Sequence, residues 1–427
     1  MNLKKFPQFL FYLLVFLIPC NLAKHWPQGW SYVSGISVDY LIPTLYLTDI
    51  LILILFGTWL IEKLNSKPKV KKYKSVYLIS GLIIFVFINI LLAKNQLAAA
   101  LKWLKLAEMG FLVFWIKTQL KSTNTLDQLT KVLSLSVIWQ SILAIIQWLK
   151  QGSVFGYLNF GEQPYSSATL GIKKISFFGQ VKVLPMGTFS HPNVLAGFLM
   201  VSLMIILSTK INKPKSLITK LALVLGILAL GLTFSFPSWL AFLIFAIWYV
   251  KAGPLHWSQI TGVFVKARPL HWRFLLGLVM LVLVFVYGLK ALEPTSFLIR
   301  IKLLGIAFRM WVSSPLFGVG LNNFIVRLEE FGRIVVNYRF LQPVHNIFFL
   351  ILAESGIVGL SLTIFILFLV FQKSVKNKNS SFLFPLCSLL FLGLFDHYWL
   401  TIQQGSLILS LALGLSLRVS TTTRKSN

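Results

Sequence analysis

The chain has 427 residues, of which 57% are hydrophobic, and its formal net charge is +29. Soluble domains contain roughly 45–50% apolar residues, and many apolar runs here are long enough to cross a hydrocarbon core of about 30 Å. The runs are continuous rather than alternating, which favours membrane helices over a membrane barrel. Most Lys and Arg residues lie in short loops between the runs, so the charge indicates membrane topology rather than nucleic-acid binding.

The apolar runs predict an all-α polytopic protein with about twelve membrane helices in a single membrane domain, residues 1–427. In chain order, the predicted helices cover residues 6–23, 44–62, 76–93, 97–117, 131–149, 192–209, 220–234, 238–250, 274–292, 345–371, 382–394 and 405–417.

The distribution of basic residues predicts how the chain is oriented. Lys and Arg gather in the short loops at 63–74, 117–131, 210–220 and 251–273. By the positive-inside rule, these loops and both termini face the cytoplasm. Two longer segments, 150–191 and 291–344, are then expected outside, in the periplasm.

The second outward segment is rich in arginine, against the positive-inside bias. Residues 296–324 begin with an amphipathic pattern that places Arg300, Leu304 and Phe308 on one helical face. Arginine suits phosphate because its planar fork binds two oxygens at once. The segment therefore indicates an anion site on an amphipathic helix, unless the loop simply escapes the bias because of its length.

Two histidines are expected at the outer ends of membrane helices, and each stands close to an asparagine. His191 and Asn193 flank Pro192, which is typical of a helix start. His345 and Asn346 precede another long apolar run. Each pair by itself fits a capped helix, but two at the same depth beside an arginine-rich segment favour a shared site.

The run at 97–117 carries charges inside a predicted membrane helix. Lys102, Lys105 and Glu108 follow each other at three-residue spacing. Ionisable groups at such positions indicate function by default. Mutual neutralisation, with the lysine side chains reaching toward the interface, explains them equally well.

Three motifs in order resemble the O-antigen ligase and O-antigen polymerase superfamily of bacterial membrane proteins: GTFSHPN (187–193), SPLFGVGLNNF (314–324) and HNIFFLILAESGIVGL (345–360). The resemblance is densest in a ligase-like core at 221–360. It implies a GT-C-like glycosyltransferase of the bacterial cytoplasmic (inner) membrane that takes a glycan from undecaprenyl diphosphate on the periplasmic side. It also implies that no metal or other cofactor is needed, and that the acceptor is a glycolipid, a glycan or a protein.

Carried over by position, the family's histidine falls on His345 and its helix-borne arginine on Arg300. Family members usually carry Ser-Arg-Gly after an apolar helix that ends in Thr, but here LTFSFPSW puts Phe236 where the arginine would stand. This departure removes one candidate diphosphate ligand. Another cation then substitutes, the acceptor chemistry differs, or activity is lost.

The expected site has two kinds of residue. His345 would orient or deprotonate the acceptor hydroxyl, and Arg300 would balance charge on the diphosphate. The residues expected to bind substrate are His191, Asn193, Arg309, Asn346 and Lys302. No His, Cys or Asp cluster has the spacing of a metal site. The alternatives are a transporter or flippase of a lipid-linked or anionic solute, and an inactive homologue.

Overall fold

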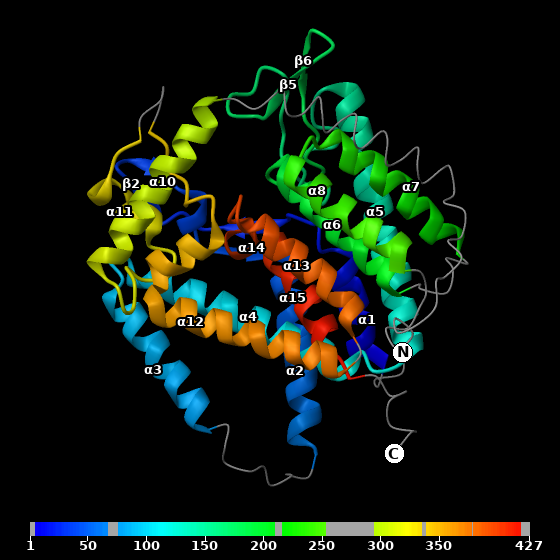
Figure 1. The fold of residues 1–427 in the computed structure, drawn as a ribbon, viewed down its shortest axis with the longest axis horizontal. Coiled ribbons are helices and arrows are strands. Elements are labelled where there is room, and N and C mark those ends of the chain that lie inside the picture. The colour runs from blue at the N-terminus through cyan, green and yellow to red at the C-terminus, as the bar shows by residue number, and fades with distance from the viewer. Residues whose placement is uncertain are drawn as a thin grey trace.

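The structure, a computed structural model, describes residues 5–66, 76–209, 216–252, 294–334, 339–377 and 379–419. Within these residues it is mostly helical, with three short antiparallel strand pairs (Figure 1). The helices are α1 (Phe6–Phe16), α2 (Leu47–Leu64), α3 (Val76–Leu92), α4 (Gln96–Gln119), α5 (Thr123–Lys150), α6 (Pro192–Thr209), α7 (Leu217–Leu232), α8 (Phe236–Ala252), α10 (Pro294–Ser313), α11 (Phe324–Phe331), α12 (Ile347–Lys376), α13 (Leu383–Leu392), α14 (Tyr398–Thr401) and α15 (Gln403–Leu417). The strands are β1 (Ala23–His25), β2 (Tyr32–Val33), β3 (Ile36–Ser37), β4 (Thr44–Tyr46), β5 (Lys174–Phe177) and β6 (Gln180–Val183).

Three described helices, α5, α6 and α12, are long and apolar enough to cross a membrane. Several other apolar helices, among them α1, α7 and α15, are shorter. A mostly helical protein with three helices that could cross a membrane is therefore confirmed, whereas the number of about twelve spans and the outward location of the two long segments stay predictions. The predicted helix at 274–292 lies outside the described residues.

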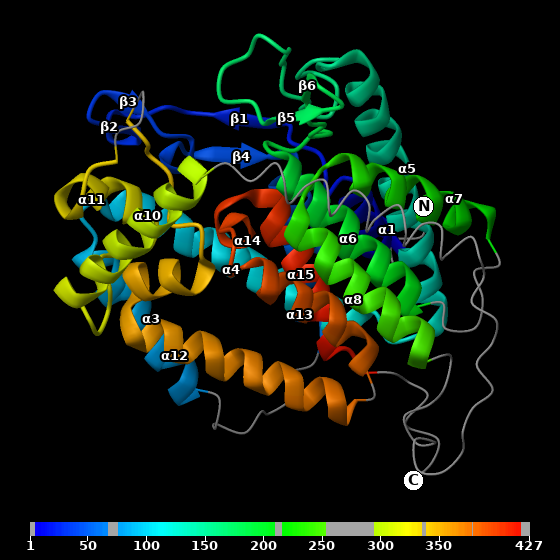
Figure 2. The ribbon, with the colours of Figure 1, turned by 45° about the horizontal axis from the view of Figure 1, so that its top comes forward.

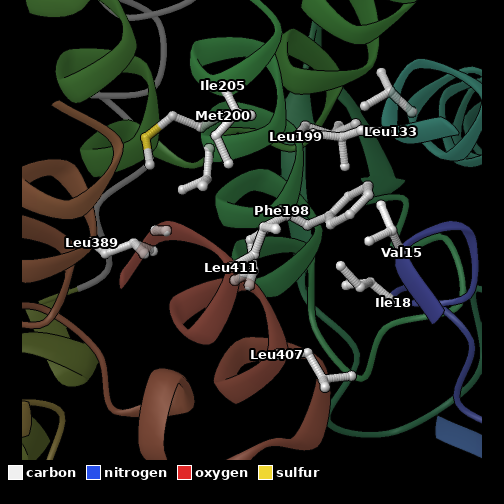
Figure 3. Close-up of a cluster of buried hydrophobic side chains, with 14 of the residues drawn as sticks. Val15, Ile18, Leu133, Phe198, Leu199, Met200, Ile205, Leu389, Leu407 and Leu411 are labelled. Carbon is white, nitrogen blue, oxygen red and sulfur yellow. The ribbon is translucent and has the colours of Figure 1, made fainter. Parts of the chain in front are cut away.

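Helix α6 forms the centre of the main hydrophobic core. It is apolar on all sides, as expected for a helix surrounded by protein, and 15 of its residues are buried. Figure 3 shows its side chains pointing in several directions, with Phe198 toward Val15 of α1 and Leu199 toward Leu133 of α5. Packing on all sides fixes the start of α6, where His191 and Asn193 lie.

Helix α12 is broken at Gly356, whose φ of 65° is left-handed. The Gly-Val-Gly loop that follows α10 fills the break with backbone hydrogen bonds: the Val319 N–H donates to the Ala353 carbonyl at 2.9 Å, and the Ile357 N–H donates to the Pro315 carbonyl at 2.9 Å. The buried Asn89 side chain donates to the Phe317 carbonyl at 2.8 Å. These bonds satisfy the backbone groups that the break frees and fasten α10 to α12.

The first long segment, 150–191, contains the β5–β6 hairpin, which projects at the top of Figure 1. The buried Glu162 carboxylate orders its beginning by accepting the backbone N–H groups of Val154 at 2.7 Å and Gly156 at 3.0 Å. In Figure 2 the β1–β4 pair extends between the part of the molecule that holds α10 and α11 and the part that holds α5 and α6. Sequence analysis had predicted neither strand pair.

Candidate functional site

A cavity of about 2060 Å³ brings several predicted site residues together. His191 and Asn193 reach it from the start of α6, Arg300 from α10, and His345 from the residue before the Asn346 cap of α12. Phe236, at the start of α8, lines the same cavity. Residues far apart in the sequence thus meet around one space.

The start of α6 holds His191 and Asn193 in defined orientations. The backbone N–H of Asn193 donates to His191 Nδ1 at 3.1 Å. A nitrogen that accepts a hydrogen bond carries no proton, so the neutral ring holds its proton on Nε2. The Asn193 side-chain amide donates to Asp396 Oδ2 at 3.2 Å. His191 therefore caps its helix, and Asn193 connects that helix to the turn before α14.

His345 is held beside the start of α12. Asn346 caps this helix, because its side-chain oxygen accepts the N–H groups of Phe348 and Phe349, each at 3.0 Å. The His345 ring stacks near Phe340 and meets His397 edge-on, with ring centroids 5.1 Å apart. Its Nδ1 is buried and has no hydrogen-bond partner among the described residues.

Asp396 and His397 lie beside His191 and His345, and we call these four residues the histidine group. Asp396 and His397 were not proposed as site residues from the sequence. Asp396 accepts the backbone N–H of His397 at 2.8 Å as well as the Asn193 amide. His397 is buried, and its Nδ1 lies 2.8 Å from Thr401 Oγ1. The available signal was an adjacent Asp-His pair at a turn between apolar runs, but its partner Asn193 lies 203 residues away.

Burial keeps the histidines of this group neutral at neutral pH. It lowers the pKa of His191 to about 4 and that of His397 to about 3, although the Asp396 charge acts in the opposite direction. Burial also lowers the pKa of His345, again opposed by Asp396, while the charges of Arg300 and Lys173 lower it further. Neutral imidazoles can accept a proton or a hydrogen bond.

Asp396 remains ionised. Burial by itself would raise its pKa, but the neighbouring His397, His345 and His191 and the His397 backbone N–H outweigh that effect and leave the pKa below its usual value. The group thus combines one carboxylate with three neutral imidazoles, and Arg300 lines the cavity close enough for its charge to act on His191 and His345.

The other predicted binding residues lie elsewhere. Arg309 is exposed, and its Nε donates to the Phe331 carbonyl at 2.7 Å, which holds α10 against the end of α11. Lys302 is also exposed, and neither residue is among those that line the cavity. Asn346 caps α12 and donates to the Leu394 carbonyl at 3.2 Å. The structure does not bring these three side chains into the cavity, and their part in binding stays a prediction.

The charges within α4 are mostly paired. Lys105 bonds to the buried Asp49 carboxylate at the start of α2, and its Nζ lies 3.8 Å from Glu108. Asp49 also accepts the Tyr46 backbone N–H at 2.8 Å. This pairing favours the neutralisation interpretation for Lys105 and Glu108. Lys102 lines the cavity and makes no ion pair with the described residues.

Among the residues that the structure describes, no group of three or more His, Cys, Asp or Glu has the arrangement of a metal site.

The chemistry that the described side chains can support is proton transfer by a neutral histidine next to a carboxylate, and anion binding by Arg300.

No curated protein matches the chain. Part of the chain matches a protein-family model. This part contains two of the three motifs noted above and the residues Phe236, Arg300 and His345. This family points to glycan transfer of the O-antigen ligase or polymerase kind. Residues 221–364 match the model of the family described as O-antigen ligase, and the resemblance inferred from the motifs is thereby confirmed.

Proposed function

We propose that the protein transfers a glycan from an undecaprenyl-diphosphate carrier to an acceptor hydroxyl on the outer face of the cytoplasmic membrane. The observation that carries this proposal is the cavity in which His345 and Arg300 meet, since both lie within the residues that match the O-antigen ligase family. A neutral histidine and a cation are the two groups that this reaction needs.

The reaction breaks the bond between the anomeric carbon and the diphosphate oxygen, and it forms a bond from the same carbon to the acceptor oxygen. The diphosphate leaves with the electron pair, so a cation at the developing charge accelerates the step. We assign this role to Arg300. The acceptor loses a proton, and we assign its capture to His345, which is neutral at the working pH.

Asp396 has a positioning role in this scheme. Its carboxylate connects the Asn193 amide to the turn that carries His397, and the His397 ring packs against His345. The charge of Asp396 also opposes the effect of burial on the pKa of His345, which makes that ring a better base.

Reconstituted membranes that contain the full chain and a lipid-linked glycan test the proposal. Arg300→Ala should lower transfer by on the order of 10²–10³-fold, as expected when a charge-stabilising donor is removed. Arg300→Lys should rescue poorly, because a point charge lacks the paired donors. Lys94→Met is the matched control, because Lys94 is an exposed cation that pairs with Glu330. Equal transfer by wild type and Arg300→Ala would refute the proposal.

Gene deletion in the host distinguishes the two reactions that the family match leaves open. Loss of glycan chain length would identify a polymerase. Loss of attachment with chain length intact would identify a ligase. An unchanged surface glycan with altered transport of the carrier would support the transporter alternative instead.

A further inference from the structure

Besides Arg300, a lysine from a different element lines the cavity near His191 and His345. Lys173 stands at the base of the β5–β6 hairpin and lines the cavity together with His191 and His345. Its charge lowers the pKa of both histidines, as that of Arg300 does. Lys173 and Arg300 therefore line the same cavity from two different parts of the fold.

The backbone of Lys173 is fixed to the segment that leads into α6. The Leu184 N–H donates to the Lys173 carbonyl at 3.1 Å, next to the register pair Lys174–Val183 of the hairpin. Leu184 and Val183 are buried. The chain from Leu184 then reaches His191 within seven residues. Lys173 thus has a defined place relative to the histidine end of the cavity.

The far end of β5 is anchored by aromatic rings. Phe177 packs edge-on against Trp148 of α5, with centroids 5.5 Å apart, and against Phe234 at 5.9 Å. Phe234 lies in the turn between α7 and α8, two residues before Phe236. Phe177 follows Lys173 by four residues, about 13 Å along an extended strand. The hairpin therefore connects two parts of the cavity lining, the α7–α8 turn and Lys173.

We propose that Lys173 and Arg300 form a two-cation site for a diphosphate, with one cation at each phosphoryl group, and that the β5–β6 hairpin positions Lys173 for this role. The assignment of the diphosphate to a glycan carrier rests on the proposed function. Phe236 lines the same cavity without a charge, so Lys173 supplies the positive charge that the α7–α8 turn does not.

The chemistry explains why two cations are needed. A diphosphate spreads its negative charge over two phosphoryl groups, and one guanidinium fork engages two oxygens of one group. A lysine ammonium is a compact point charge that suits the second group. As the bond to the glycan breaks, the added charge develops on the diphosphate, so both cations act where it develops.

Binding of inorganic pyrophosphate to the full-length purified protein tests the proposal without any transfer reaction. Lys173→Met should weaken pyrophosphate binding at least about tenfold, the usual effect of losing one hydrogen bond to a charged group. Lys173→Arg should retain most of the affinity. Lys182→Met is the matched control, because Lys182 lies on the partner strand of the same hairpin and does not line the cavity.

A second variant separates positioning from charge. Phe177→Ala should weaken pyrophosphate binding by releasing the hairpin from Phe234, and it should add little in the Lys173→Met background, because both changes remove one interaction. Additive losses would contradict the role of the hairpin.

The outcomes also separate the two proposals. Undiminished binding by Lys173→Met, with binding lost in Arg300→Met, would overturn the two-cation site and leave the proposed function standing. Undiminished binding in both variants, or no binding by the wild type, would overturn the two-cation site and remove the phosphate role of Arg300 as well.

Discussion

Replacing Asp396 with Asn removes one charge from the histidine group and changes little else in shape. Asp396 Oδ1 accepts the His397 backbone N–H at 2.8 Å, and Oδ2 accepts the Asn193 amide at 3.2 Å. Asn has one carbonyl oxygen, so it can keep the first bond, but it then turns an amide donor toward the Asn193 donor. The substitution therefore removes the charge and the connection to α6 together.

The expected loss follows from these contacts. A hydrogen bond to a charged group contributes about 1.5–3 kcal/mol, which corresponds to roughly 10- to 150-fold in rate. The Asp396 charge raises the pKa of His345, which burial has already lowered. Without that charge the pKa of His345 falls further, and the ring becomes a weaker base. We therefore expect a lower maximal rate, together with a rate that persists to lower pH.

The assay is the rate of glycan transfer by reconstituted protein between about pH 4 and about pH 8. The pH below which the rate falls should move down in Asp396→Asn. It should move up in Arg300→Met, because the Arg300 charge lowers the pKa of His345 and its removal has the opposite sign. An upward shift in Asp396→Asn, or an unchanged profile with an undiminished rate, would refute this account of the histidine group.

Three further predictions concern other parts of the molecule. His345→Ala should lower transfer by about 10²- to 10⁴-fold and leave binding of the donor lipid nearly intact, with His345→Gln retaining a small residual rate; full turnover in His345→Ala would reduce this residue to a helix-end role. Gly356→Ala should lower the thermal unfolding midpoint, because its Cβ would come within 2.3 Å of Leu316 and its φ is 65°, whereas Gly305→Ala, inside a helix where the Cβ would make only an ordinary contact with the Arg309 side chain at 3.6 Å, should not. Reporter fusions should place 150–190 outside and 210–220 inside. The reverse result would put Arg300 on the cytoplasmic side, opposite to the expected lipid-linked donor.

The helix positions could be predicted well from the sequence, because long apolar runs specify membrane helices directly. The predicted and observed bounds of α6 are the same, Pro192–Thr209. The break at Gly356 could not be predicted, because it depends on backbone bonds from a loop about forty residues earlier in the chain. The β5–β6 hairpin was missed because its short strands carry little periodic signal.

The candidate site was predictable in part. Two histidines and an arginine at similar depth indicated a shared site, and His191, His345 and Arg300 do line one cavity. Helical geometry explains why Lys302 and Arg309 do not join them. At about 100° per residue, they point roughly 200° and 180° away from Arg300 around the axis of α10. Asp396 was not predicted as a site residue, because its partners are set by packing between helices rather than by spacing along the chain.

The three segments that form the histidine end of the cavity are each held by backbone groups. The Asn193 N–H bonds to the His191 ring at the start of α6, and Asn346 caps α12 next to His345. Helix α10, which carries Arg300, is fastened to α12 where the loop after α10 fills the break at Gly356. Because the last contact lies about eleven residues from His345, changes in that loop will alter the distance between Arg300 and His345 without touching either side chain. A loss of transfer in a variant that keeps both Arg300 and His345 is therefore the expected signature of such a change.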